Sequence, residues 1–79
     1  MSLHIITYHH PEYWRVTSVT KADSKELADK EVESLESKGF RIDFICDTSD
    51  PISLFNLGAS MGEYSSDEQG KIRGILCQK

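Results

Sequence analysis

The segment Asp23–Phe40 constrains the fold of this chain more than any other, because it has an amphipathic helical pattern with a signal at each end. Asp23 is predicted to be the N-cap, and Glu26 three residues later completes a capping box that satisfies free backbone N–H groups. Gly39 can adopt the left-handed conformation that ends a helix, and Phe40 can fold back as the hydrophobic contact that follows. The sequence therefore predicts a helix with defined ends.

One side of this predicted helix is apolar and the opposite side is acidic. At 100° per residue, the apolar face contains Leu27, Ala28, Val32 and Leu35, and the acidic face contains Glu26, Asp29, Glu33 and Glu36. Glu31 interrupts the apolar stripe, and an unpaired buried charge costs several kcal/mol. Three interpretations of Glu31 stay open: it reaches water, it pairs with Arg15 or Arg41, or it is a functional carboxylate. The helix itself should pack on one face of a sheet.

Three segments alternate between apolar and polar residues in the way that is typical of β-strands. Leu3–His9 and Tyr13–Thr20 flank a turn at residues 10–12, which predicts an antiparallel hairpin. A third strand is expected over Phe40–Cys46, with Phe40, Ile42, Phe44 and Cys46 on one face. We expect a single α+β domain over residues 1–79, with a small antiparallel sheet of three or four strands in the order β-β-α-β.

Shorter elements are predicted after the third strand. Asp50 followed by Pro51 is typical of an N-cap and first helical residue, which predicts a short helix over Pro51–Leu57. Gly58–Ser66 is then expected to be a mobile loop of small residues. This stretch contains a G-x-S-x-G pattern, but no histidine follows it and the chain is too short for a hydrolase fold. No catalytic residue is therefore assigned.

The C-terminal segment is compatible with two structures. A helix is indicated by the capping residues Ser65 and Glu68 and by apolar residues at helical spacing. A strand over Lys71–Cys77 is the alternative, because Gly70 and Gly74 each cost about 1 kcal/mol inside a helix. The sequence favours the helix slightly.

Charge is distributed unevenly along the chain, whose net charge is −4. Between Ile42 and Gly70 there is no Lys or Arg, and the acidic residues are Asp43, Asp47, Asp50, Glu63, Asp67 and Glu68. Such a segment disfavours direct nucleic-acid binding, which relies on cations that displace counterions from phosphates. It suits a basic protein partner or a solvated surface. Without a membrane-length apolar run or a signal-peptide pattern, a cytoplasmic protein without membrane contact is expected.

Two groups of residues are candidates for partner binding. Tyr8, Tyr13 and Trp14 concentrate aromatic area around the hairpin, and such side chains anchor protein interfaces. Asp43, Asp47 and Asp50 gather acidic charge where the third strand ends. We therefore expect a small non-enzymatic binding or regulatory module, such as an accessory or mobile-element protein, that acts through a protein–protein surface. The modest apolar content is also compatible with a homodimer.

The alternative hypothesis is a metal-dependent protein or enzyme that uses His9, His10 and Glu12. Neighbouring residues on a strand point to opposite faces, so the two histidines could share an ion only if the turn brings them together. Cys46 and Cys77 lack metal-ligand spacing. Both are expected to be small buried hydrophobic residues, although a disulfide between them stays open. No cofactor is expected.

Overall fold

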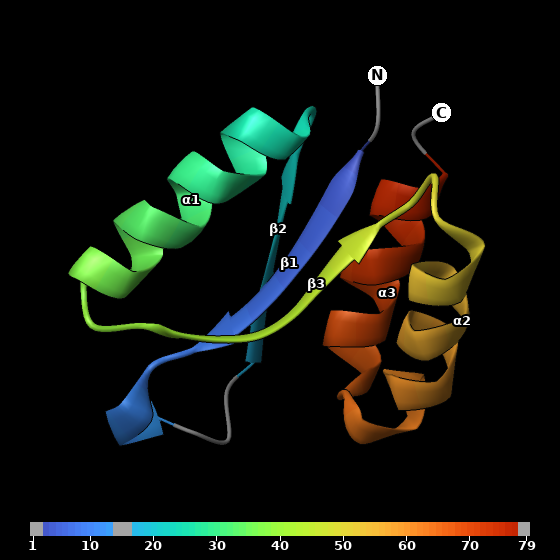
Figure 1. Cartoon of the computed structure of the whole chain (residues 1–79). Helices are drawn as coiled ribbons and strands as arrows, with labels where there is room; N and C mark the ends of the chain where they lie inside the picture. Colours follow the sequence, from blue (N-terminus) through green and yellow to red (C-terminus); the bar gives the residue numbers. More distant parts are fainter. Residues whose placement is uncertain (1–2, 14–16, 78–79) are drawn as a thin grey trace.

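The computed structural model describes residues 3–13 and 17–77 (Figure 1). The elements in chain order are β1 (His4–His9), η1 (Pro11–Tyr13), β2 (Thr17–Ala22), α1 (Lys25–Ser37), β3 (Arg41–Asp47), α2 (Pro51–Ser60), η2 (Met61–Glu63) and α3 (Ser66–Leu76), where η1 and η2 are short 3-10 helices. In the described part of the chain, β1 is the central strand of a three-stranded sheet and pairs antiparallel with β2 and β3. The predicted α+β fold is confirmed.

The ends of α1 show one correction and one confirmation. The N-cap is Ser24 rather than Asp23, because the Ser24 hydroxyl accepts the Leu27 N–H at 3.1 Å. At the other end Gly39 has a φ of 93°, as predicted. The Phe40 N–H donates to the Leu35 carbonyl at 3.0 Å, which completes the six-residue hydrogen-bonded loop of a Schellman motif.

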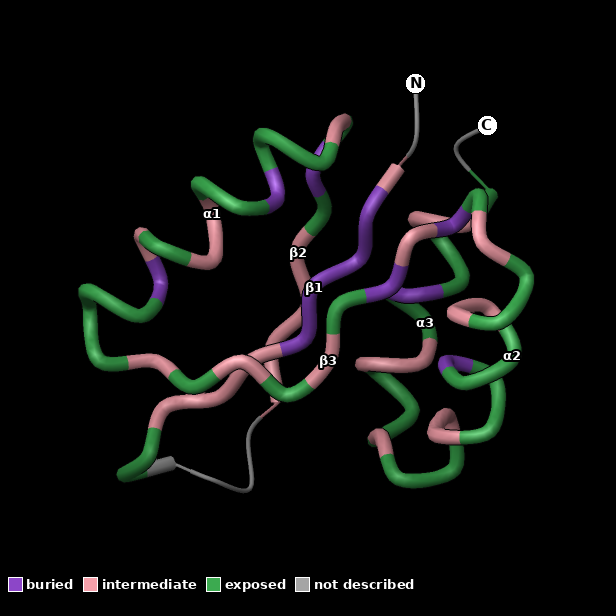
Figure 2. Tube along the Cα trace, in the orientation of Figure 1, coloured by how far each residue is buried: buried purple, intermediate pink, exposed green. Residues whose placement is uncertain are grey.

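The sheet lies between two helical layers, with α1 on one face and the α2–α3 pair on the other (Figure 1). On the α1 side the buried residues are Ile6, Ala22, Ala28 and Leu35. On the α2–α3 side they are Ile5, Cys46, Leu57 and Ile72. Consecutive residues of β1 point to opposite faces, so Ile5 and Ile6 contribute to different cores. The predicted helix therefore covers one face, and two later helices cover the other (Figure 2).

β3 changes faces at a β-bulge. Thr7 pairs with Phe44 and Tyr8 pairs with Ile42, so Asp43 is the extra residue that has no opposite partner. As a consequence, Phe40 and Ile42 pack on the α1 side, while Phe44 packs on the α2–α3 side. The prediction of one continuous apolar face over residues 40–46 was wrong, because the bulge shifts the alternation by one residue.

The C-terminal half is more helical than predicted. α2 continues through Gly58 to Ser60, and η2 follows directly, so most of the predicted loop Gly58–Ser66 is helical. α3 is a helix rather than a strand, and its N-cap Ser65 accepts the Glu68 N–H at 3.3 Å. The Gln69 side-chain amide donates to two backbone carbonyls of the α2–α3 connection, which fixes the connection against α3.

The second strand of the hairpin begins later than predicted. β2 begins at Thr17, so the predicted strand start at Tyr13 was wrong; Tyr13 is instead the last residue of η1. Trp14 and Arg15 lie outside the described residues, as does the Tyr13 side chain.

Across residues 3–13 and 17–77, no helix combines the length and the apolar character needed to cross a membrane.

Candidate functional site

The β-bulge directs the Asp43 carboxylate toward His9 on β1. His9 Nδ1 lies 2.7 Å from Asp43 Oδ1 and 3.0 Å from Oδ2. A carboxylate only accepts, so the Nδ1–H of His9 donates, and Nε2 is the remaining ring nitrogen. Both side chains are partly accessible, with 20% of His9 and 34% of Asp43 exposed. The pair therefore orients an imidazole at the surface.

This pair lies at the edge of a surface hollow. The hollow has a volume of about 320 Å³ and is lined by His9, Thr17, Asp43, Glu63 and Tyr64. Its walls come from all three strands and from the connection between α2 and α3. Titratable side chains from separate segments of the chain therefore meet around one hollow.

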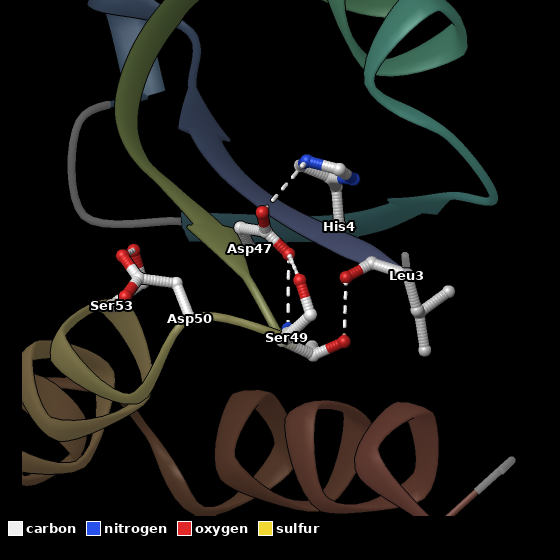
Figure 3. Close-up of polar contacts among 7 residues, drawn as sticks. Leu3, His4, Asp47, Ser49, Asp50 and Ser53 are labelled. Carbon is white, nitrogen blue, oxygen red and sulfur yellow. Dashed lines mark hydrogen bonds and ion pairs between the residues drawn. The ribbon is translucent and has the colours of Figure 1, made fainter. Parts of the chain in front are cut away.

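A second polar group closes the far end of β3 (Figure 3). The Thr48 hydroxyl and N–H donate to the Leu3 carbonyl at 2.7 and 3.0 Å. The Ser49 hydroxyl and N–H donate to Asp47 Oδ1 at 2.7 and 2.9 Å. On the other side of that carboxylate, His4 Nε2 lies 3.9 Å from Asp47 Oδ2. These contacts fix the exit of the chain from β3 into α2.

Asp47 and Asp50 have structural roles at this strand end. The hydrogen bonds from the Ser49 side chain and backbone lower the pKa of Asp47 below its ordinary value. Asp50 is the N-cap of α2, where its carboxylate accepts the Ile52 N–H at 3.3 Å and the Ser53 hydroxyl at 3.0 Å. Together with the His9–Asp43 pair, all three acids predicted to bind a partner are engaged within the molecule.

The predicted aromatic surface is only partly visible. Tyr8 is half-buried on the α1 side, and its ring meets the edge of Phe40 at a centroid distance of 5.2 Å. Tyr8 therefore contributes to the core. The other two predicted aromatic contacts, the Tyr13 side chain and Trp14, lie outside the described part.

The predicted metal candidates point in different directions. His9 faces Asp43, whereas His10 Nδ1 accepts the Glu12 N–H at 3.2 Å and the His10 ring lies against Phe40. Over residues 3–13 and 17–77, no three His, Cys, Asp or Glu side chains form a group that could hold a metal ion. The turn does not bring the two histidines together.

Glu31 is half-buried on α1. It forms no hydrogen bond or ion pair with another described residue. Arg41, one of its two predicted partners, is exposed on β3 opposite His9. The other predicted partner, Arg15, is outside the described residues. Among the described residues the structure therefore gives Glu31 no pairing on which a site could be built.

The two cysteines are free thiols in different environments. Cys46 is fully buried in the core between β3 and the α2–α3 pair, as predicted. Burial raises the pKa of the Cys46 thiol, and the charges of Asp47 and Asp50 raise it further. Cys77 is exposed, so the prediction that both cysteines are buried was wrong for this one.

The most exposed large apolar side chains of the described residues lie on α2. Ile52 is 71% exposed and Phe55 is 76% exposed, and their spacing of three places them on the same side of the helix. Gly58 and Ala59 follow one turn later and are also exposed. We refer to Ile52, Phe55, Gly58 and Ala59 as the α2 outer face.

The α2 outer face is also uncharged. Residues 51–62 contain no Asp, Glu, Lys, Arg or His. Two polar side chains elsewhere on α2 form local hydrogen bonds, Ser53 to the N-cap Asp50 and Ser60 to the Leu57 carbonyl. Sequence reasoning missed this surface, although the uncharged window inside an acidic segment was a visible signal. Large exposed apolar patches with a polar rim are a common feature of interaction sites.

Comparison with known proteins finds no relative, since no protein-family model, no curated protein and no solved structure matches the chain. Its function must therefore be inferred from its own residues and geometry.

Proposed function

We propose that this chain is a small non-enzymatic binding module of the cytoplasm, and that the α2 outer face is its surface for a protein partner. The observation that carries the proposal is the exposure of Ile52 and Phe55 on an uncharged helix. Full burial of side chains of this size against a partner contributes about 1.5–3 kcal/mol each relative to exposure. Apolar anchors three positions apart on one helix face are the pattern of helices that bind in a groove.

The outer side of α2 is accessible to a partner, while its inner side stays packed in the hydrophobic core. Leu54 and Leu57 pack toward the sheet with Ile5 and Ile72, so the inner side of α2 is occupied. The outer residues make no comparable contribution to that core. Removing the apolar character of Phe55 therefore costs the fold little, whereas a partner surface would lose its anchor. Binding and folding depend on different sides of the same helix.

Acidic residues flank the α2 outer face at its two ends. Asp50 precedes the helix and Glu63 follows it, within a segment that has no Lys or Arg from Ile42 to Gly70. Peripheral charges of one sign guide association and select partners more than they add affinity. This arrangement is compatible with a protein partner that is apolar at the centre of its contact, and it disfavours nucleic acid.

Site-specific photo-crosslinking tests the proposal. Phe55 is replaced by p-benzoylphenylalanine in the native host, and the control chain carries the same group at Glu33, an exposed position on α1. We expect position 55 to give a defined covalent adduct with a protein and position 33 to give none. An absence of adducts at position 55, or identical adducts at both positions, would contradict the proposal.

A further inference from the structure

We infer that the partner of the α2 outer face is a second copy of this chain, so that two molecules pair through antiparallel α2 helices. The inference rests on the proposed function, because it names the partner of the same surface. A twofold contact places one surface against itself, so each feature of the surface must tolerate its own copy. The lack of charge and the shape of the α2 outer face both meet this requirement.

The charge distribution favours a second copy over a basic partner at this surface. The chain carries a net charge of −4, but none of that charge lies within residues 51–62. An acidic patch facing its own copy would be repelled, whereas an uncharged apolar patch is not. A basic partner would instead be attracted to the acids outside α2, such as Glu63 and Asp67 on the connection and start of α3.

The shape of the α2 outer face is complementary to that of a second, antiparallel copy. Its first half carries the large side chains Ile52 and Phe55, and its second half carries the small residues Gly58 and Ala59. Nothing lies within 4 Å of the place where a Cβ of Gly58 would be, so this position is open to solvent. A twofold axis can cross the two paired helices on their outer side, at the level of residue 57 along each helix. Phe55 of one molecule then lies against Gly58 and Ala59 of the other. Small residues let two helix backbones approach closely around such a large side chain.

The size of the contact predicts weak association. A helix of ten residues is about 15 Å long, so two α2 helices cover less than the roughly 800 Å² per partner of a standard interface. We therefore expect monomer at about 10 µM and a substantial dimer fraction at about 1 mM.

The salt dependence of the association constant distinguishes a second copy from a basic partner. Antiparallel pairing brings Asp50 of one molecule toward Glu63 of the other at both ends of the contact. Salt screens this repulsion, because the Debye length falls from about 10 Å at 0.1 M to about 3 Å at 1 M. Self-association should therefore strengthen with salt, whereas attraction of a basic partner would weaken.

Sedimentation equilibrium from 10 µM to 1 mM, at 0.05 and 0.5 M NaCl, tests the inference on the full chain. The wild type should dimerise, with an association constant that rises with salt. Phe55→Ser and Ala59→Lys should lower the association constant at least tenfold. The matched control Ser37→Lys, at an exposed position on α1, adds the same charge as Ala59→Lys and should leave the constant unchanged. Circular dichroism verifies that each variant is folded.

Three results would overturn the inference: a wild type that is monomeric at 1 mM, dimerisation unaffected by Phe55→Ser and Ala59→Lys, or dimerisation weakened by salt. Its failure is distinguishable from failure of the proposed function. If the wild type is monomeric but photo-crosslinking at position 55 captures a different protein, the second copy is rejected and the binding surface stands. If position 55 also gives no adduct, both are rejected.

Discussion

His9 and Asp43 are 34 positions apart in the sequence, yet His9 Nδ1 lies 2.7 Å from Asp43 Oδ1 because a bulge inserts Asp43 between the paired residues of β3. The same bulge places Ile42 on the α1 side of the sheet and Phe44 on the α2–α3 side. The extra residue therefore has two effects. It divides the alternate apolar residues of β3 between the two cores, and it turns the Asp43 carboxylate toward His9 at the surface.

A double-mutant cycle measures the strength of this pair. His9→Gln, Asp43→Asn and the double variant should give a coupling free energy of about 0.2–1 kcal/mol at pH 7, because both side chains are partly exposed to solvent. Urea denaturation provides the three differences in the free energy of unfolding. A coupling energy of zero would contradict a net contribution of this pair to stability.

Asp47 should make stability depend on acid pH. Hydrogen bonds from Ser49 hold the pKa of Asp47 below its ordinary value of 3.8, so the unfolded chain binds the proton more readily than the folded one. The contribution of Asp47 is therefore complete above its unfolded pKa and is lost as the pH falls through the lower, folded pKa. Urea denaturation between pH 2 and pH 6 should show that Asp47→Asn removes part of the wild-type decline. Identical pH profiles would contradict this role.

The two thiols should differ in reactivity. Cys46 is buried and has a raised pKa, so little reactive thiolate is present at pH 8, while Cys77 is exposed. A thiol reagent should modify Cys77 quickly and Cys46 only when the protein opens or unfolds. Mass spectrometry of the timed reaction identifies the modified peptide, and Cys77→Ser is the control that removes the fast phase. Fast modification of Cys46 in that control would show that its core site is open.

Two glycines inside α3 should be destabilising relative to alanine. A Cβ at Gly70 or Gly74 would have no atom within 4 Å, and neither residue has a positive φ. Gly74→Ala should therefore raise the free energy of unfolding by about 0.5–1 kcal/mol, since alanine loses less backbone entropy in a helix. Gly39→Ala is the contrasting control and should lower stability, because Gly39 has a φ of 93°. Equal effects at the two positions would contradict the helix assignment of residues 66–76.

Local sequence signals predicted the elements whose ends depend on neighbouring residues. The C-terminal glycine of α1, the N-caps Asp50 and Ser65, and the antiparallel hairpin could all be identified from short patterns. α2 was predicted too short because Gly58 was expected to end it. The helix continues because the burial of Leu57 and the packing of Met61 offset the cost of about 1 kcal/mol for glycine.

The candidate site was less predictable, because it depends on register. His9 was considered with its neighbours His10 and Glu12, and Asp43 with Asp47 and Asp50. Nothing in the local sequence indicates a bulge, so their pairing across 34 positions could not be derived. The exposed side of α2 likewise depends on which residues the sheet buries, although the absence of charge in residues 51–62 was visible.

The most direct test of the α2 outer face as a self-binding surface is a dilution series from 1 mM to 20 µM followed by ¹H–¹⁵N NMR correlation spectra at 0.5 M NaCl. Concentration-dependent amide shifts should be confined to residues 51–62 and be absent in Phe55→Ser. The principal competing contacts are the edges of β2 and β3, since both are outer strands of the sheet. Shifts confined to residues 17–22 or 41–47, or spectra that do not change on dilution, would contradict pairing through α2.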